Sequence, residues 1–261
     1  MKNRAIGVFD SGVGGLTVLK EIEKLLPNEN IIYFGDTARV PYGNKSKSTI
    51  VQFSTENILF LLKEKVKMVV VACNTSSSLA LGYLKDIFKI PIIGVIEAGV
   101  NKALTVSLNR RVGVIGTKST IDSKSYQNLI KSKDKKTVVF GKSCPLFVPL
   151  VEEGLLKGTL VNETISLYLS RFIKDKVDTV ILGCTHYPLL KNPISDYLKN
   201  VNIIDSAKEV AIHTKGVLAE NDLLNCKNIR GEKVFYVSDE TKNFANLAKL
   251  FLKRSIKTIK L

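Results

Sequence analysis

Short apolar runs of strand length alternate throughout the chain with longer segments in which apolar residues recur at helical spacing. The run 68–72 is purely apolar, as expected of a strand that is buried on both faces of a sheet. The segment 16–26 instead has leucine or isoleucine every three or four residues and ends before Pro27, which favours a helix. This alternation predicts an α/β fold with mostly parallel sheets flanked by helices.

The same criteria predict the remaining strands and helices. We expect further strands at residues 6–9, 31–34, 92–96, 112–116, 136–140, 178–182, 201–204 and 233–237. We expect further helices at about residues 47–65 and 241–253.

The chain contains an internal repeat that includes two of its cysteines. Residues 66–75 align with residues 177–186 at an offset of 111, which places one cysteine on another. Residues 6–11 align with residues 112–117 at an offset of 106. Two matches in the same order at similar offsets predict two pseudo-symmetric α/β lobes.

The length of the chain, 261 residues, corresponds to one or two domains. We assign residues 1–98 to a first α/β lobe and residues 99–210 to a second. The tail, residues 211–261, is too short for a third domain, so we expect it to complete the first lobe. The chain would then pass between the lobes near residues 97–99 and 205–208.

Composition excludes several classes of protein. Hydrophobic residues make up 45% and charged residues 24% of the chain, which excludes a largely disordered protein. No apolar run reaches the ~18 residues that a membrane span needs. The N-terminus meets Asp10 before the apolar region of a signal peptide can form. We therefore expect a cytoplasmic protein without a membrane partner.

The net charge of +15 raises the question of a nucleic-acid partner. The lysines are scattered along the chain and form no stripe with aromatic residues, so we expect a basic surface and no nucleic-acid partner. A homodimer remains open at this point.

The four cysteines, Cys73, Cys144, Cys184 and Cys226, form no CxxC pair. This spacing excludes zinc-ribbon and thioredoxin patterns, and we expect no metal. In a cytosolic chain each cysteine is either a small buried residue or a reactive thiol. We expect Cys144 and Cys226 to be structural or incidental, because neither follows a strand of the internal repeat.

A glycine-rich segment follows the first predicted strand, at the edge where parallel sheets bind ligands. The segment runs from Asp10 to Gly15 and lacks both the third glycine of a dinucleotide fingerprint and the lysine of a P-loop. The segment is either only a tight strand-to-helix turn, or a turn that also places the Asp10 carboxylate and the Ser11 hydroxyl at a ligand site.

Two further polar segments follow equivalent strands of the repeat. Cys73 precedes Asn74 and Thr75, which are typical of a helix N-terminus, and free N–H groups there favour a thiolate. Cys184 precedes Thr185 and His186 in the other lobe. Each cysteine alone is compatible with a structural role, but the same cysteine in both lobes favours a paired function.

Two opposed thiols suit proton transfer at a carbon stereocentre. One thiolate removes the α-proton from one face, and the other thiol delivers a proton to the opposite face. The ordinary cysteine pKa of ~8.5 makes both protonation states accessible, and each thiol needs an activator, Asp10 for Cys73 and His186 for Cys184. No pyridoxal lysine motif is recognisable, so we expect no cofactor.

At these positions the sequence resembles the cofactor-independent glutamate racemases. The matching segments, in chain order, are GVFDSGVGGL at 7–16, YFGDTARVPYG at 33–43, ACNTS at 72–76 and GCTHYPL at 183–189. The resemblance covers essentially the whole chain and implies two pseudo-symmetric lobes with the active site between them. It also implies interconversion of L- and D-glutamate, the latter for peptidoglycan synthesis.

The resemblance further implies the roles of individual residues. Cys73 would deprotonate D-glutamate with help from Asp10, and Cys184 would deprotonate L-glutamate. His186 would assist Cys184, with Glu152 nearby. The implied substrate contacts are Asp10, Ser11, Pro41, Tyr42, Gly43, Asn74, Thr75, Thr117, Thr120, Thr185 and His186.

Several alternatives remain open from the residues alone. Glu153 could act in place of Glu152. An aspartate racemase would use the same thiol pair, and only the resemblance favours glutamate. A two-lobed binding protein would need no thiol, and a Cys–His hydrolase using Cys184 and His186 would leave Cys73 without a role.

Overall fold

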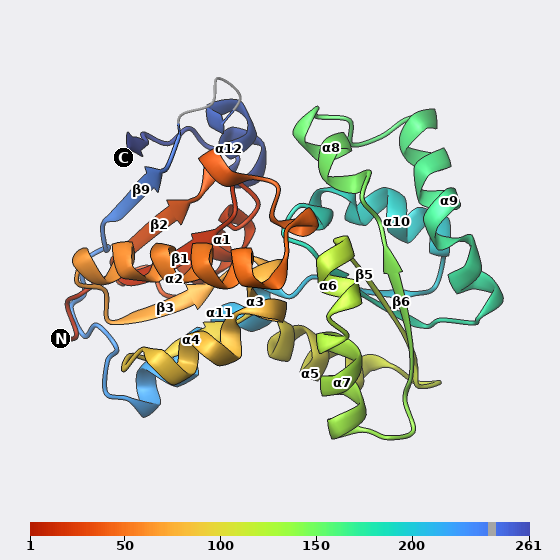
Figure 1. Ribbon diagram of the computed structural model, residues 1–261, viewed down its shortest axis with the longest axis horizontal. Helices are drawn as coiled ribbons and strands as arrows, with labels where there is room; N and C mark the ends of the chain where they lie inside the picture. Colours follow the sequence, from red (N-terminus) through yellow and green to blue (C-terminus); the bar gives the residue numbers. More distant parts are fainter. Residues whose placement is uncertain (240–243) are drawn as a thin grey trace.

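The computed structural model describes residues 1–239 and 244–261, which form two parallel β-sheets that lie side by side (Figure 1). In the first sheet the strand order is β10-β9-β2-β1-β3-β4, and every neighbouring pair is parallel. Its strands are β1 (Ile6–Asp10), β2 (Ile31–Gly35), β3 (Met68–Val71), β4 (Ile92–Gly94), β9 (Lys233–Val237) and β10 (Ile259–Lys260).

The second sheet has the order β6-β5-β7-β8 and is also parallel throughout. Its strands are β5 (Arg111–Gly116), β6 (Val138–Ser143), β7 (Thr179–Gly183) and β8 (Asn202–Ile204). The α/β fold predicted from the alternating pattern is confirmed.

The internal repeat of the sequence is a repeat of strand register. In the first sheet Gly7 of β1 is the partner of Val69 in β3, and in the second sheet Gly113 of β5 is the partner of Val180 in β7. These four positions are the ones that the two sequence offsets align. Since β1 and β5 are each flanked by equivalent strands, the two lobes share one topology. The central strands of each lobe therefore end at the same, carboxyl, edge of their sheet.

Helices cover both faces of each sheet. The α-helices are α1 (Leu16–Leu25), α2 (Lys47–Lys63), α3 (Asn74–Leu79), α4 (Leu81–Ile87), α5 (Ile96–Val106), α6 (Lys118–Asp122), α7 (Ser125–Lys133), α8 (Phe147–Glu152), α9 (Thr159–Lys174), α10 (Lys191–Leu198), α11 (Ala207–Glu220) and α12 (Phe244–Leu252). Three short 3₁₀ segments within the described residues are η1 (Thr37–Arg39), η2 (Tyr42–Asn44) and η3 (Tyr187–Leu190).

The core consists of layers on either side of the sheets. On the first sheet, α1, α11 and α12 pack over one face, while α2 and α4 pack over the other. On the second sheet, α5 and α7 cover one face, while α8, α9 and α10 cover the other. Because every strand in the middle of a sheet is covered twice, β1, β3 and β7 are buried at every position.

Some predicted boundaries are corrected by the structure. The strand expected at 136–140 is β6, Val138–Ser143. It is an edge strand whose pairing with β5 continues through Gly141 and Lys142, which an apolar pattern cannot reveal. The helix expected at 47–65 ends at Lys63, and residues 241–243 of the last predicted helix lie outside the described residues.

The tail returns to the first lobe, as its strands β9 and β10 extend the first sheet beyond β2. Both termini lie on this lobe (Figure 1). Helix α11 packs against α1 of the first lobe and α5 at the start of the second, and it runs across the predicted lobe boundary at residue 210. The assignment of residues 1–98 and 211–261 to one lobe and 99–210 to the other stays a prediction.

Among the described residues, no helix combines the length and the apolar character needed to cross a membrane.

Candidate active site

A cavity of about 210 Å³ lies between the two lobes, where the carboxyl ends of both sheets meet. Its lining includes most of the residues that the sequence singled out, namely Ser11, Pro41, Tyr42, Gly43, Cys73, Asn74, Thr75, Thr117, Glu152, Cys184, Thr185 and His186. Asp10 and Thr120 lie behind this lining and are fully buried. The repeat therefore brings two cysteines from equivalent strand ends to one enclosed space.

Cys73 lies at the carboxyl end of β3 and caps the start of α3. Its Sγ is 3.8 Å from Ser11 Oγ, so Ser11, rather than Asp10, is in direct contact with the thiol. Burial and, to a smaller extent, the charge of Asp10 raise the pKa of Cys73, hydrogen bonds with Ser76 and Ser11 lower it, and the net pKa is about 12. Desolvation thus outweighs the preference for a thiolate that the helix start favours.

Cys184 belongs to a chain of polar contacts in the second lobe. Its Sγ is 3.9 Å from His186 Nδ1, and His186 Nε2 is 3.2 Å from Glu152 Oε1. Burial disfavours a charged imidazolium, but the contacts with Cys184 and Glu152 and the charge of Asp10 outweigh it and raise the pKa of His186 to about 10. His186 is therefore suited to stay protonated beside a Cys184 thiolate.

The structure distinguishes the two glutamates at the end of α8. Glu152 lines the cavity and contacts His186, whereas Glu153 is exposed and outside the cavity lining. The ring of Phe251 from α12 packs edge-on against His186, with ring centroids 5.7 Å apart. His186 is thus held between a carboxylate on one side and an aromatic ring on another.

Asp10 connects the lobes from beneath the cavity. Its Oδ1 accepts from Gly12 N at 3.1 Å, and its Oδ2 accepts from Thr185 Oγ1 of the second lobe at 3.3 Å. Burial raises the pKa of Asp10, while the charge of His186 and the hydrogen bonds to Asp10 lower it. Its carboxylate is thus close enough to influence both Cys73 and His186 electrostatically.

Two glycines allow the lobes to approach closely at the cavity. A Cβ atom on Gly14 would overlap Thr185 Oγ1 and lie 2.7 Å from His186 Nδ1. A Cβ atom on Gly43 would lie 2.7 Å from Thr117 Cβ of the other lobe. The glycine-rich segment after β1 therefore provides room for the opposite lobe.

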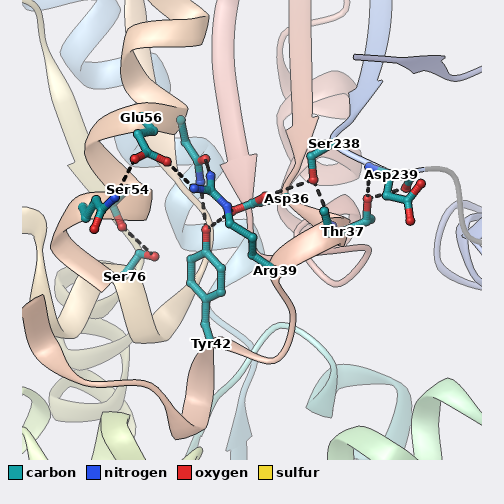
Figure 2. Close-up of polar contacts among 12 residues, drawn as sticks. Asp36, Thr37, Arg39, Tyr42, Ser54, Glu56, Ser76, Ser238 and Asp239 are labelled. Carbon is teal, nitrogen blue, oxygen red and sulfur yellow. Dashed lines mark hydrogen bonds and ion pairs between the residues drawn. The ribbon is translucent and has the colours of Figure 1, made fainter. Parts of the chain in front are cut away.

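The segment after β2 carries Tyr42 and Gly43 into the cavity and is held by a polar cluster (Figure 2). The Tyr42 hydroxyl donates to Asp36 Oδ2, which also accepts from Arg39 Nε at 2.6 Å. Ser238, beyond β9, donates to Asp36 Oδ1 at 2.9 Å. The fully buried Asp36 thus fixes the cavity wall at Tyr42.

Threonine hydroxyls form a further contact between the lobes. Thr75 Oγ1 is 3.0 Å from Thr117 Oγ1 and 3.4 Å from Thr120 Oγ1. Thr117 also caps the start of α6 by accepting from Thr120 N. Thr120 therefore acts on the cavity through Thr75 and Thr117.

The sequence did not single out several residues of the cavity wall. These are Val40, Asn44, Lys118, Pro145, Val148, Pro149 and Tyr187. Lys118 directly follows Thr117, one of the implied substrate contacts, and this adjacency in the sequence is the signal that points to its place in the cavity wall. Pro145, Val148 and Pro149 lie around α8, outside the repeated motifs, and only the tertiary structure brings them to the cavity.

The other two cysteines lie outside the cavity lining. Cys144 is fully buried and Cys226 is exposed; neither lines the cavity. All four cysteines are free. Within residues 1–239 and 244–261, no group of three or more His, Cys, Asp or Glu side chains is arranged to hold a metal ion.

Comparisons with known proteins agree with this geometry. Residues 6–214 match the Asp/Glu/Hydantoin racemase family. The chain is 48% identical to a glutamate racemase from Aquifex aeolicus, covering 95% of this chain and 93% of the relative. It is 47% identical to one from Sulfurihydrogenibium sp., covering 98% of this chain and 96% of the relative.

A solved structure of glutamate racemase from Francisella tularensis, in complex with D-glutamate, superposes with a TM-score of 0.94. The two sequences are 41% identical, and the match covers 100% of this chain and 98% of the other. The likeness extends over both lobes and the cavity between them. The chain therefore belongs to the Asp/Glu/Hydantoin racemase family.

Proposed function

We propose that this protein is a glutamate racemase that interconverts L- and D-glutamate by proton transfer between two thiols and the α-carbon. The observation that carries the proposal is the pair Cys73 and Cys184, which reach one cavity from equivalent strand ends of opposite lobes. Glutamate, rather than aspartate, is the substrate named for the relatives that are 47–48% identical.

In the proposed reaction one cysteine, as thiolate, takes the α-proton and becomes a thiol. The other cysteine, as thiol, gives its proton to the opposite face of the carbanion-like intermediate and becomes a thiolate. The reverse reaction exchanges these roles. Between two turnovers in the same direction, the first thiol gives its proton to solvent and the second thiolate takes one from solvent, which restores the starting state. Following the resemblance, Cys73 serves as base for D-glutamate and Cys184 for L-glutamate.

The polar groups behind each thiol support this division. His186 and Glu152 form a chain to Cys184, and a protonated His186 stabilises a thiolate there. Among the described residues, Cys73 has no cation of this kind in contact with its thiol, and it lies near the charge of Asp10. The α-ammonium group of the substrate supplies a positive charge to the cavity, which favours the Cys73 thiolate.

The substrate carboxylates require hydrogen-bond donors and positive charge. We propose that Asn74, Thr75 and Thr185 bind glutamate beside the thiols, and that Tyr42 and Gly43 contribute backbone N–H groups from the cavity wall. Preorganised donors of this kind also stabilise charge that develops when the α-proton leaves. Lys118 at the rim adds positive charge for an anionic substrate.

We place the reaction in the cytoplasm, where its D-glutamate would supply peptidoglycan synthesis. The proposed chemistry needs both thiols reduced, and reducing compartments keep cysteines free. All four cysteines are free in the structure, which agrees with such a compartment.

The test is to incubate the purified protein, without added cofactor, separately with L- and D-glutamate and to follow circular dichroism to the racemic end point. We expect both reactions to proceed, with L-aspartate as the control substrate reacting at least about 10²-fold more slowly in kcat/KM. Each of Cys73→Ala and Cys184→Ala should abolish racemisation in both directions. Equal turnover of aspartate, or activity retained by either variant, would contradict the proposal.

α-Deuterated substrates test the assignment of helpers to thiols. Asp10→Asn should alter the isotope effect mainly in the direction that Cys73 initiates, and His186→Asn mainly in the direction that Cys184 initiates. Because the enantiomers have an equilibrium constant of one, kcat/KM for unlabelled substrate stays equal in the two directions. Identical changes of both isotope effects in both variants would refute the assignment.

A further inference from the structure

A hydrogen bond crosses from the second lobe to the amide of Asn74 at the cavity. The hydroxyl of Tyr126 lies 2.7 Å from Asn74 Oδ1. Tyr126 belongs to α7 of the second lobe, whereas Asn74 is the first residue of α3 in the first lobe. Asn74 lines the cavity directly beside Cys73, but Tyr126 is absent from the cavity lining.

The ring of Tyr126 is held rigidly by its surroundings. Its side chain is fully buried in the apolar cluster between α5, α7 and the second sheet, together with Val100, Val114, Ile130 and Ile181. A ring packed in this way places its hydroxyl at one fixed point. The position of that hydroxyl is therefore set by the core of the second lobe, not by the cavity.

The polar partners of Tyr126 determine which way its hydroxyl donates. The Ser206 hydroxyl is buried, without a partner within hydrogen-bond distance among the described residues, and it lies close enough to Tyr126 to lower the pKa of the phenol. Burial nevertheless raises the pKa of Tyr126 far above neutrality, so the phenol keeps its proton. Because an amide oxygen can only accept, Tyr126 donates that proton to Asn74 Oδ1 across the 2.7 Å contact.

An amide whose oxygen accepts from Tyr126 must turn its nitrogen the other way. No residue in the described part of the chain accepts a hydrogen bond from Asn74 Nδ2, and the Asn74 side chain faces the cavity. The nitrogen is thus an open donor beside Cys73. The opposite amide orientation would present an oxygen to a substrate carboxylate and repel it.

We propose that Tyr126 is a positioning residue of the active site, which holds the Asn74 amide so that Nδ2 donates to a carboxylate of the substrate. Because the two residues come from different lobes, the donor is fixed only when the lobes are packed as in this structure. The inference rests on the proposed function for the identity of the substrate, and it adds a residue outside the cavity that determines substrate binding.

The first test is Tyr126→Phe, which removes the hydroxyl and keeps the ring. Loss of the orienting hydrogen bond should raise KM for L- and D-glutamate about tenfold, while kcat changes less than about threefold. The matched control is Tyr197→Phe in α10, which also removes a hydroxyl that bonds within the second lobe, to Ser166 at 3.1 Å. The control should leave KM unchanged.

A double-mutant cycle separates positioning from a general structural effect. If Tyr126 acts through the amide, Tyr126→Phe should have no further effect on kcat/KM in an Asn74→Ala protein. The proposal would be overturned if the two changes lower kcat/KM independently, so that their factors multiply in the double variant. An unchanged KM in Tyr126→Phe would also overturn it. If Tyr126→Phe does not fold, Asn74→Ala alone still tests the pair, because an unchanged KM there refutes the role of the donor.

A negative result of the Tyr126–Asn74 cycle is distinguishable from a failure of the proposed function. Racemisation by the unaltered protein establishes that function whatever the cycle gives. If the unaltered protein does not racemise glutamate, the proposed function fails by itself, before any variant is compared.

Discussion

Replacing Gly14 with alanine would test how closely the lobes must approach for catalysis. The new methyl group would lie 2.7 Å from His186 Nδ1 and would overlap Thr185 Oγ1. Ordinary contact needs ~3.5 Å, so His186 must move by about 0.8 Å, and Thr185, which would be closer to the new methyl group, must move by more. That displacement would separate Thr185 from Asp10 and move His186 relative to the Cys184 thiol.

A misplacement near 1 Å at a reacting centre costs on the order of 10²-fold in rate. We therefore expect Gly14→Ala to lower kcat/KM for glutamate by about 10²-fold in both directions. The cost in unfolding free energy should be about 1–3 kcal/mol, as for other overpacked sites. Racemisation followed by circular dichroism and unfolding followed in urea give the two numbers.

Gly216→Ala is the matched control. Gly216 lies inside α11, and a Cβ atom there would meet no heavy atom of the described residues within 4 Å, apart from the backbone of its own helix. Alanine favours a helix over glycine, so this variant should gain about 0.5–1 kcal/mol of stability and keep full activity. If Gly14→Ala retains kcat/KM within threefold of the unaltered protein, the close approach of the lobes is not needed for catalysis.

Three other predictions concern groups around the fold. Glu29→Gln should destabilise the protein by about 3–5 kcal/mol in urea unfolding, because it leaves the buried Lys67 ammonium without its carboxylate partner; a loss below about 1 kcal/mol would refute this. The raised pKa of His186, about 10, means that the folded state binds the extra proton. Its stabilising contribution is complete below pH ~6.5 and is lost as the pH rises towards 10, so urea unfolding should show a steeper decline over this range than in His186→Asn. Cys226→Ser should leave racemisation and stability unchanged, because Cys226 is exposed. Cys144→Ser should keep turnover and lose stability, because Cys144 is fully buried. A large fall in turnover of the folded Cys144→Ser protein would show that Cys73 and Cys184 are not the catalytic pair.

The sequence alone determined the architecture of this protein because the signals for it are local or repeated. A strand buried on both faces must be apolar throughout, so 68–72 was recognisable without any partner. The offset that placed Cys184 on Cys73, together with the offset of 106, predicted two similar lobes, and the structure adds that β1–β3 and β5–β7 share one register. Cysteines at equivalent strand ends lie at the ligand-binding edges of their sheets, so the repeat in the sequence is enough to predict the thiol pair.

Only the tertiary structure decided how the thiols are surrounded. Burial raises the pKa of Cys73 to about 12, although its place at a helix start favours a thiolate, because desolvation depends on what the opposite lobe covers. The choice of Glu152 over Glu153 depends on how α8 is rotated towards His186. The bond from Tyr126 to Asn74 joins residues 52 positions apart, in a pair that no periodicity connects. Such contacts between lobes are properties of packing, and a one-dimensional pattern carries no record of them.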